Sequence, residues 1–316
     1  MTTRETVLAV DAGQTGMKVR YRDADGRVWE ETHAGIRTDG ALLPQIAEVA
    51  RAVTRRSPAP GPLTLAAGVS GLTSREADAD QLLAMLHDLP VHRVALAHDS
   101  TTSYLGALGD ARGAVVAAGT GVVTLAVGPD RLARVDGWGN LLGDAGSGYW
   151  IGREALDAVM RDFDGRGPAT PLRALAEERW PLLTEAYIDL QTAPDRVRTI
   201  ASFAAPVAAL AAAGDPVALR ITDRAAAELA HSVATALHRV MPEGGALAPV
   251  CTIGGVFHSQ PLTERFAAHL AASGVPAQIV PAQGSGLDGV VALAALASAH
   301  PLSSAISSAA SIVGAA

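Results

Sequence analysis

Short apolar runs, bounded by glycine-containing turns, alternate with longer stretches of helical spacing in the first third of the chain. Continuous apolar runs of about 4–8 residues are typical of buried strands, whereas apolar residues at i, i+3 and i+4 indicate helices. The pattern predicts strands over residues 7–12, 17–22, 27–32, 63–69 and 93–97, and helices over 42–53, 76–87 and from Asp99 onward. A Pro/Gly break at 57–62 follows the first helix. The predicted element order is therefore β-β-β-α-β-α-β-α.

The same order restarts at residue 113 and is interrupted by a long alanine-rich stretch. Strands are expected over 114–118, 122–127, 131–135, 249–253 and 277–280, and helices near Ser147, from Ser259, from Leu287 and through about 171–241. Breaks are expected at Pro181, at Pro194 and at Gly214-Asp215-Pro216, where Asp215 would cap the next helix. The tail after Pro301 is predicted to be a weak helix or a frayed end.

These patterns predict two lobes, residues 1–112 and a larger lobe of residues 113–316 that carries a helical insertion over 165–241. The last helix is a candidate to pack back on the first lobe. The halves share almost no sequence, so the repeat is one of architecture. The length agrees, because about 150 residues per domain suggests two domains for 316 residues.

Composition and charge narrow the classes of function. Hydrophobic residues make up 49% of the chain and aromatic residues 4%, which indicates a globular protein with closely packed helices. The formal net charge of −7 argues against nucleic acid as a partner, because binding its phosphates needs a basic face. Cys251 is the single cysteine, which excludes a disulfide framework within one chain. Without a signal-peptide pattern or a long apolar run, we expect a cytoplasmic protein with no membrane contact.

Two glycine-bracketed turns, each between two strand-like runs, are the most informative feature. The first covers Asp11 to Gly16 (DAGQTG), and the second is Gly119-Thr120-Gly121. Turns built from Gly, Thr and Asp expose backbone N–H groups in a small concavity that suits phosphate oxygens. One such turn in each lobe predicts a nucleotide held in a central cleft.

The first turn offers groups for both phosphate and metal. Gly13, Thr15 and Gly16 would face the phosphates, Lys18 would add positive charge, and Asp11 would hold Mg²⁺ through water. The turn is followed by a strand, so it is neither a Walker A loop nor a dinucleotide fingerprint. The alternative is an ordinary hairpin that uses Asp and Gly for turn geometry.

Asp99 lies at the end of a predicted strand and directly before a helix. Aspartate is a favoured N-cap, so capping alone would explain it. Ligands of open α/β sheets, however, bind at the carboxyl ends of strands. A carboxylate there can accept the proton of an attacking sugar hydroxyl. Gly71, just after the strand 63–69, is a further candidate for contacting substrate.

The segment 135–152 (VDGWGNLLGDAGSGYWIG) has too many glycines to be a core strand or helix. Glycine lets the backbone approach a ligand closely. Trp138 offers a flat face to a sugar ring, and Asp144 offers a carboxylate to its hydroxyls. A long loop with aromatic anchors is the alternative.

Gly254 and Gly255, at the end of the strand 249–253, would allow close approach to adenine, and Gly214 is a minor nucleotide candidate. The histidines show no metal-ligand spacing.

Taken in order, these motifs resemble the sugar-kinase/actin/Hsp70 superfamily, and within it the BadF/BadG-type ATPase family that includes N-acetylglucosamine kinase. The similarity runs from Val7 to about Ala297, and DGWGNLLGDAGSGYWIG and IGGVFHSQPLTERF are its most specific parts. The resemblance implies two actin-like, ribonuclease H-like lobes. Each would hold a mixed five-stranded sheet with helices around a central nucleotide cleft. It also implies ATP and Mg²⁺ as cofactors and suggests a homodimer.

The resemblance also implies residue roles. Thr15 and Thr120 match the phosphate contacts and Asp99 the catalytic base. Gly255 and Ser259 match contacts to the adenine nucleotide. The loop that would contact the sugar is matched by Gly137, Trp138, Gly139 and Asp144.

Two features of the chain depart from the family pattern. The segment 35–39 stands where family kinases often have a sugar-contacting Asn. If Asp39 fills that position, its carboxylate accepts hydrogen bonds without donating any, which would suit a free-amino sugar better than an acetamido sugar. The first turn has fewer glycines than the family form, which leaves Gln14 without a role. The branch of the family that activates dehydratases holds an iron–sulfur cluster with cysteines. Cys251 lies in the predicted adenosine strand, far from a suitable position for such a cluster, so this branch is disfavoured.

The predicted activity is therefore ATP-dependent phosphorylation of an amino sugar, N-acetylglucosamine to its 6-phosphate above all. The sequence leaves open a glucosamine or N-acetylmuramic acid kinase. It also leaves open a non-catalytic sensor of sugar or nucleotide, and an ATPase coupled to a partner protein. Free-amino and acetamido sugars are not distinguished by these residues.

Overall fold

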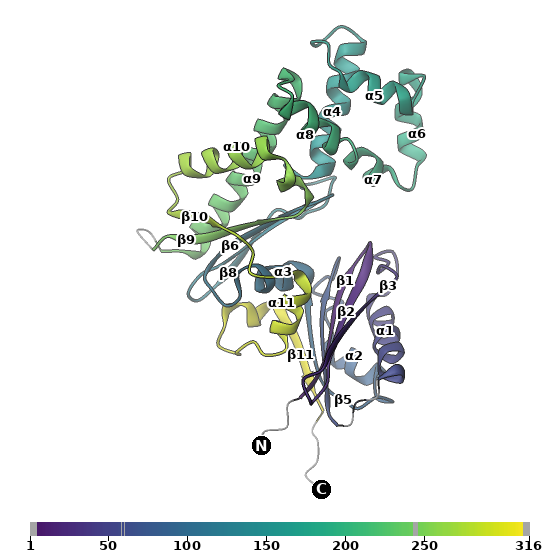
Figure 1. The fold of residues 1–316 in the computed structure, drawn as a ribbon, viewed down its shortest axis with the longest axis vertical. Coiled ribbons are helices and arrows are strands. Elements are labelled where there is room, and N and C mark those ends of the chain that lie inside the picture. Colours follow the sequence, from purple (N-terminus) through teal and green to yellow (C-terminus); the bar gives the residue numbers. More distant parts are fainter. Residues whose placement is uncertain (1–4, 58, 60, 243–245, 312–316) are drawn as a thin grey trace. The chain divides into compact units, whose positions relative to one another are not determined.

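The computed structural model describes residues 5–57, 59, 61–242 and 246–311, and the chain divides into two compact units (Figure 1). Unit 1 comprises Met1–Ala111, Pro129–Arg131 and Ala282–Ala316. Unit 2 comprises Arg112–Gly128 and Leu132–Pro281. Residues 58 and 60 of the predicted break and residues 312–316 of the predicted tail lie outside the described residues.

Unit 1 is built on a six-stranded mixed sheet with the order β11-β5-β4-β1-β2-β3. Its strands are β1 (Thr6–Gly13), β2 (Gly16–Arg22), β3 (Val28–His33), β4 (Leu63–Val69), β5 (Val91–His98) and β11 (Ile306–Ala310). The central strands β1, β4 and β5 are parallel. Every residue of β4 is buried, as its continuous apolar sequence predicts.

Four helices cover the two faces of this sheet. They are α1 (Leu42–Arg56), α2 (Ala79–Met85), α3 (Asp99–Leu108) and α11 (Gly286–Leu293). In Figure 1, α1 and α2 lie on one side of the sheet and α3 and α11 on the other. The fully buried side chains of Leu8, Ile46, Leu65 and Leu82 fill the core between the sheet, α1 and α2.

The tail after Pro301 is a correction to the sequence-based expectation. It forms a short 3₁₀ helix (Pro301–Ala305) followed by β11, which pairs antiparallel with β5. The predicted weak helix or frayed end is therefore wrong for these residues, and the first sheet has six strands where five were predicted. The segment is rich in Ser and Ala and has weak β-propensity, so its structure depends on the exposed edge of β5.

Unit 2 contains a five-stranded mixed sheet with the order β10-β9-β6-β7-β8. Its strands are β6 (Gly113–Ala118), β7 (Val122–Val127), β8 (Leu132–Val135), β9 (Ala248–Ile253) and β10 (Ala277–Val280). The long helix α9 (Pro216–Val240) packs on β6, β7 and β8, and α10 (Gln260–Ala272) packs on α9. Asp215 caps α9 as predicted, because its Oδ1 accepts the Ala218 N–H at 2.8 Å. The predicted α/β class with two mixed sheets is confirmed.

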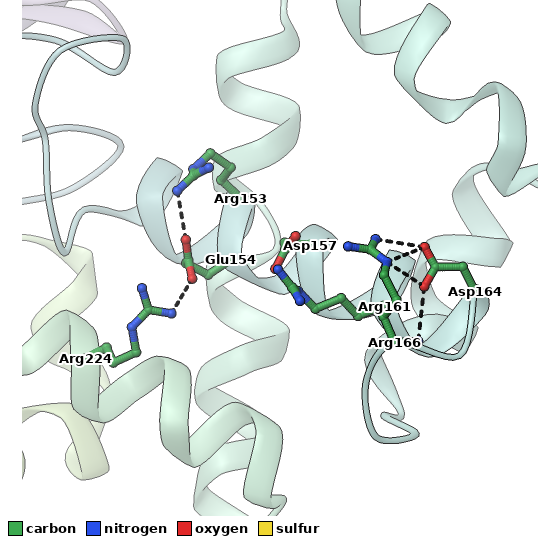
Figure 2. Close-up of polar contacts among 7 residues, drawn as sticks. All are labelled: Arg153, Glu154, Asp157, Arg161, Asp164, Arg166 and Arg224. Atoms are coloured by element: carbon green, nitrogen blue, oxygen red, sulfur yellow. Dashed lines mark hydrogen bonds and ion pairs between the residues drawn. The ribbon is translucent and has the colours of Figure 1, made fainter.

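Between β8 and α9 lie the helices α4 (Gly148–Phe163), α5 (Leu172–Arg179), α6 (Ala186–Thr192), α7 (Arg196–Ala201) and α8 (Ala204–Ala212). The predicted insertion of residues 165–241 thus comprises α5 to α9, and α4 precedes it. Figure 2 shows the ion pairs along α4. Glu154, only 11% exposed, contacts Arg153 on its own helix and Arg224 on α9. The Arg224 guanidinium also lies 5.2 Å from the Trp150 ring centroid. These contacts join α4 to α9.

Among the described residues, no individual helix has the length and hydropathy that crossing a membrane requires. One pair, Arg196–Ala212 with Pro216–Val240, satisfies both criteria only when taken together, and it is bent by 114° at its break.

Glycines let α3 and α11 cross with their backbones in contact. A Cβ at Gly289 would overlap the carbonyl oxygen of Thr102, and a Cβ at Gly106 would overlap the carbonyl oxygen of Ser285. The Gln283 N–H adds a 3.0 Å hydrogen bond to the Ala107 carbonyl. Small residues at both positions are therefore a steric requirement of this helix pair.

We expect Gly289→Ala to lower the free energy of unfolding by about 3 kcal/mol, because neither backbone can make room without moving a helix. In an exposed helix the same change would stabilise the protein by roughly 1 kcal/mol, so a decrease in the free energy of unfolding indicates the close helix crossing. Urea unfolding measures it. Gly40→Ala is the matched control, because a Cβ at Gly40 meets no atom within 4 Å. Equal stability of the two variants would contradict the close crossing.

Candidate functional site

The first turn is a tight hairpin between β1 and β2, and a neighbouring loop supports it. Gly13 and Gly16 are cross-strand partners, which leaves Gln14 and Thr15 exposed at the tip. The Gly13 carbonyl accepts the Ile36 N–H at 3.0 Å. A Cβ at Gly35 would overlap the Gln14 carbonyl. The loop after β3 is thus packed directly against the backbone of the predicted phosphate turn.

Asp11 lies beside this turn in an environment that disfavours its charge. Burial raises the pKa of the Asp11 carboxyl above its ordinary value, and the negative charge of Asp99 raises it further. Lys18, the cross-strand partner of Asp11, opposes the shift. On its other side, a Cβ at Gly286 would lie only 3.0 Å from Asp11 Oδ2, which places the start of α11 against the carboxylate. A cation bound here would relieve the repulsion between the two aspartates.

Asp99 is the first residue of α3, and His98 before it is the N-cap. His98 Nδ1 accepts the Ser100 N–H at 3.1 Å, so capping does not use the Asp99 carboxylate. The same ring nitrogen lies 2.9 Å from Asp99 Oδ1. Asp99 is 35% exposed, and its carboxylate is therefore accessible to a ligand.

The other substrate candidates of unit 1 have different environments. Asp39 is 70% exposed, and its carboxylate pairs with the Arg37 guanidinium at 3.1 Å. That hydrogen-bonded pair lowers the pKa of Asp39. Gly71 adopts φ +76° and lies against the Thr38 side chain, which a Cβ at Gly71 would approach to 2.8 Å. The loop that carries Asp39 therefore meets the end of β4 at Thr38.

The second turn lines a cavity of about 480 Å³ that lies within unit 2. Four of the predicted nucleotide residues line it together: Gly119, Thr120, Gly255 and Ser259. Small residues of α8 and the segment before it, including Ala201, Ala205 and Ala208, form another part of the lining. The volume is typical of a small-molecule site.

Two observations show that the lining suits a bound ligand. The Ser259 hydroxyl is buried, yet it has no hydrogen-bond partner among the described residues. Buried hydroxyls are normally paired, so a donor or acceptor from a ligand would satisfy it. At Gly119 and at Gly255, an added Cβ would meet no atom within 4 Å, so the space beside both is open.

The other predicted nucleotide glycines do not line this cavity. Gly121 faces Asp144, whose Oδ2 would lie 2.8 Å from a Cβ. Gly254, with φ +100°, packs against the backbone of Ala118. Gly214 adopts φ +88° in the turn between α8 and α9. These positions serve the local backbone conformation, and nucleotide contact at them stays a prediction.

The predicted sugar loop presents Trp138 to solvent. Its side chain is 61% exposed, and the Arg134 guanidinium lies 5.3 Å from the ring centroid. Arg134 also donates to the carbonyls of Asp136 and Gly137. Gly137 and Gly139 both have positive φ, 78° and 82°. The ring is thus held by an arginine that is itself fixed to the loop backbone.

Asp144 is the most buried carboxylate of the candidate site, at 7% exposure. Burial raises the pKa of its carboxyl, while the backbone N–H groups of Val122 and Gly139 favour the ionised form. Asp136, which the sequence did not single out, lies nearby and accepts three backbone N–H groups. Hydrogen bonds of Asp144 to a sugar stay a prediction.

Sequence reasoning missed three parts of these sites. His98 was treated as one of several scattered histidines, although a histidine next to a strand-end aspartate can cap the helix. Asp136 stands before a glycine, a common turn signal. The alanines that line the cavity carry no local signal, because they belong to an alanine-rich stretch.

Among the described residues, no group of three or more His, Cys, Asp or Glu is arranged to hold a metal.

Comparison with known proteins places the chain in a family. Over 178 residues, 53% of this chain and 55% of the relative, it is 29% identical to the N-acetylmuramic acid/N-acetylglucosamine kinase of Clostridium acetobutylicum. Over 81 residues, a quarter of each chain, it is 40% identical to the N-acetyl-D-glucosamine kinase of Dictyostelium discoideum. The matches thus span about half and a quarter of these curated relatives.

A solved structure from Chromobacterium violaceum, whose name gives N-acetylglucosamine kinase as a suggested activity, has the same fold. Its TM-score is 0.68 at 24% identity, and the match covers 92% of this chain and 99% of that one. The pattern of the BadF/BadG/BcrA/BcrD ATPase family matches residues 8–291, and the chain therefore belongs to this family.

Proposed function

We propose that the protein transfers the γ-phosphoryl group of ATP to an amino sugar, N-acetylglucosamine above all. The observation that carries the proposal is the cavity in unit 2, because residues expected to contact the nucleotide from two separate motifs line it together. The family is one of ATPases, and the two curated relatives are named as kinases of acetamido sugars.

The nucleotide has a chemically suitable site in unit 2. The small apolar side chains of α8 would accept the flat face of adenine, and Ser259 would supply a hydrogen bond. Gly119 and Thr120 would lie toward the phosphates, where open space beside Gly119 permits close approach of an oxygen.

Mg²⁺ fits the carboxylate of Asp11. The ion usually keeps several waters and is bound by one or two carboxylates together with substrate phosphates. Asp11 is ionisable, lies beside the first turn and shares its surroundings with Asp99, so it would hold the metal through water. When bound, the metal neutralises charge on the transferred phosphoryl group.

Asp99 would act as the general base. Its carboxylate is accessible, is free of the capping role and lies at the carboxyl end of β5. In this role it accepts the proton of the sugar hydroxyl, at C6 of N-acetylglucosamine, as the oxygen attacks phosphorus. Such proton transfer contributes about 10²–10⁴-fold in rate.

The sugar would stack on Trp138 and meet the loop of Gly137, Gly139 and Asp144. The pairing of Asp39 with Arg37 favours a surface role for that carboxylate, which weakens the case for a free-amino sugar bound through it. N-acetylmuramic acid is a second candidate, since the relative from Clostridium acetobutylicum is named for both sugars. The homodimer and the cytoplasmic location stay predictions.

The test is ADP release by the purified protein with Mg²⁺ and each of N-acetylglucosamine, N-acetylmuramic acid, glucosamine, N-acetylmannosamine and glucose. We expect N-acetylglucosamine to stimulate release at least tenfold and its 6-phosphate to accumulate. ATP turnover that no sugar changes would instead indicate an ATPase coupled to another partner. Binding without turnover would indicate a sensor.

Asp99→Asn should reduce kcat at least a hundredfold, because the amide cannot accept the proton. Affinity for the nucleotide should change less than twofold. Steady-state kinetics and calorimetric titration with a non-hydrolysable ATP analogue measure the two quantities. Wild-type turnover in this variant would rule out Asp99 as the base.

Asp11→Asn should raise stability and abolish activity. Since the folded-state pKa of Asp11 is raised, the folded protein binds this proton more tightly than the unfolded chain. The ionised group therefore costs stability at neutral pH, and that cost falls as the pH drops through the folded pKa toward the ordinary value of 3.8. We expect the thermal unfolding midpoint to rise by about 2 °C at pH 7.5. Asp25→Asn, at an exposed turn, should change neither quantity, and a less stable Asp11→Asn would contradict the buried-charge argument.

Ala205→Trp should raise the KM for ATP at least tenfold, because the indole would occupy the cavity of unit 2. Ala209→Trp is the matched control, since Ala209 is also exposed on α8 and does not line the cavity. Equal KM values for the two variants would place the nucleotide elsewhere. Urea unfolding should show equal stability for both.

A further inference from the structure

Two aspartates bracket the predicted sugar loop in a backbone conformation that is rare for any residue but glycine. Asp136 and Asp144 both have φ 59°, and no other non-glycine residue of the described chain has positive φ. Such a conformation is strained for an L-residue, although aspartate tolerates it better than most. It persists only where surrounding contacts fix it, and residues strained in this way cluster at functional sites.

Asp136 organises the loop internally. Its Oδ1 accepts the N–H groups of Gly137 at 2.7 Å and Asp144 at 2.8 Å, and its Oδ2 accepts that of Ala145 at 2.9 Å. Gly143 passes so close that a Cβ there would overlap Asp136 Oδ1. One carboxylate therefore closes the loop from residue 136 to residue 145.

Asp144 connects the closed loop to the second turn. Its buried carboxylate lies directly against the turn, because Asp144 Oδ2 would be only 2.8 Å from a Cβ at Gly121. The same carboxylate interacts with the N–H of Val122, the residue that directly follows the turn, and with the N–H of Gly139 inside the loop. Just beyond the loop, the N–H groups of Gly148 and Tyr149 donate to the carbonyls of Gly119 and Thr120, at 2.8 and 3.0 Å. The turn and the loop therefore share a continuous hydrogen-bonded backbone within unit 2.

We propose that Asp136 is a positioning residue that couples the two ligands. By holding Asp144 against the turn, it makes nucleotide binding at Gly119 and Thr120 order the sugar loop, so that the second ligand binds more tightly. This rests on the proposed function, in which the turn receives phosphates and the loop receives sugar.

The coupling follows from the connectivity of these groups. A phosphate that shifts or rigidifies the turn acts on Val122, and through the Asp144 carboxylate on Gly139 beside Trp138. The order already imposed by the first ligand does not have to be imposed again by the second, which gives positive cooperativity. By linkage the effect is reciprocal and lies typically between 5- and 150-fold.

Calorimetric titration of N-acetylglucosamine, with and without Mg²⁺ and a non-hydrolysable ATP analogue, measures the coupling. We expect the analogue to tighten sugar binding about tenfold in the wild type. Asp136→Ala should reduce this factor to below twofold, while the analogue alone binds within threefold of its wild-type affinity. Asp136→Asn should be intermediate, because asparagine also tolerates positive φ and keeps one acceptor oxygen.

Asp157→Asn is the matched control. It removes a carboxylate of α4 in the same unit that pairs with Arg161, and it should keep the full coupling factor. If Asp136→Ala does not fold, Asp136→Asn decides. Coupling of wild-type size in the folded Asp136 variants would overturn the proposal, and so would independent binding of the two ligands to the wild type.

Amide hydrogen exchange distinguishes this proposal from the proposed function. The analogue alone should slow exchange at Asp144 and Ala145 in the wild type and to a smaller extent in Asp136→Asn. Slowed exchange together with no amino sugar bound would overturn the sugar kinase and its cooperativity but leave the turn–loop connection intact. Sugar binding with unchanged exchange would overturn only the connection.

Discussion

The backbone contact between α3 and α11 is the constraint on which the first site depends. Because Gly106 and Gly289 carry no side chain, the two helices cross at backbone distance, and the last part of the chain becomes part of unit 1. The contact fixes the start of α11 beside Asp11 and the start of α3 at the end of β5. A salt bridge of 2.7 Å between Arg20 and Asp288 secures the same helix to β2. Asp288, hydrogen-bonded by Ser285 and paired with Arg20, has its pKa lowered to about 2.

Unit 2 uses the same principle with different elements. Gly152 brings α4 against the carbonyl of Ile200 at the end of α7, and Gly128 does the same for β7 and the carbonyl of Val240. The Gly152 approach sets α4 against α7, and residues of both helices line the cavity. In both units, therefore, glycine determines where backbones meet, and the candidate sites lie beside these meeting points.

The sequence predicted the elements that carry their own periodicity and the sites that carry their own motifs. The apolar run of β4 and the Asp-Pro start of α9 are determined locally, so both were predicted within a residue or two. β11 was not, because a Ser- and Ala-rich segment becomes a strand only when the edge of β5 is available. The helix start at Asp99 was predicted, but its cap was not, since the cap is an imidazole where a carboxylate was expected. The alanine lining of the cavity depends on long-range packing and left no local pattern.

The aspartates with shifted pKa values include an exposed group with lowered values and a buried group with raised values. Four exposed carboxylates, at Asp39, Asp88, Asp130 and Asp164, have lowered pKa values because each is hydrogen-bonded to an arginine. Only Asp11 and Asp144 have aspartate pKa values raised by burial among the described residues for which a shift is resolved. A buried carboxylate to which no arginine is hydrogen-bonded is costly to keep ionised, and such groups cluster where chemistry needs them. Asp39 therefore resembles the surface carboxylates and Asp144 resembles Asp11, which supports our proposal that the sugar contacts the glycine-rich loop of unit 2.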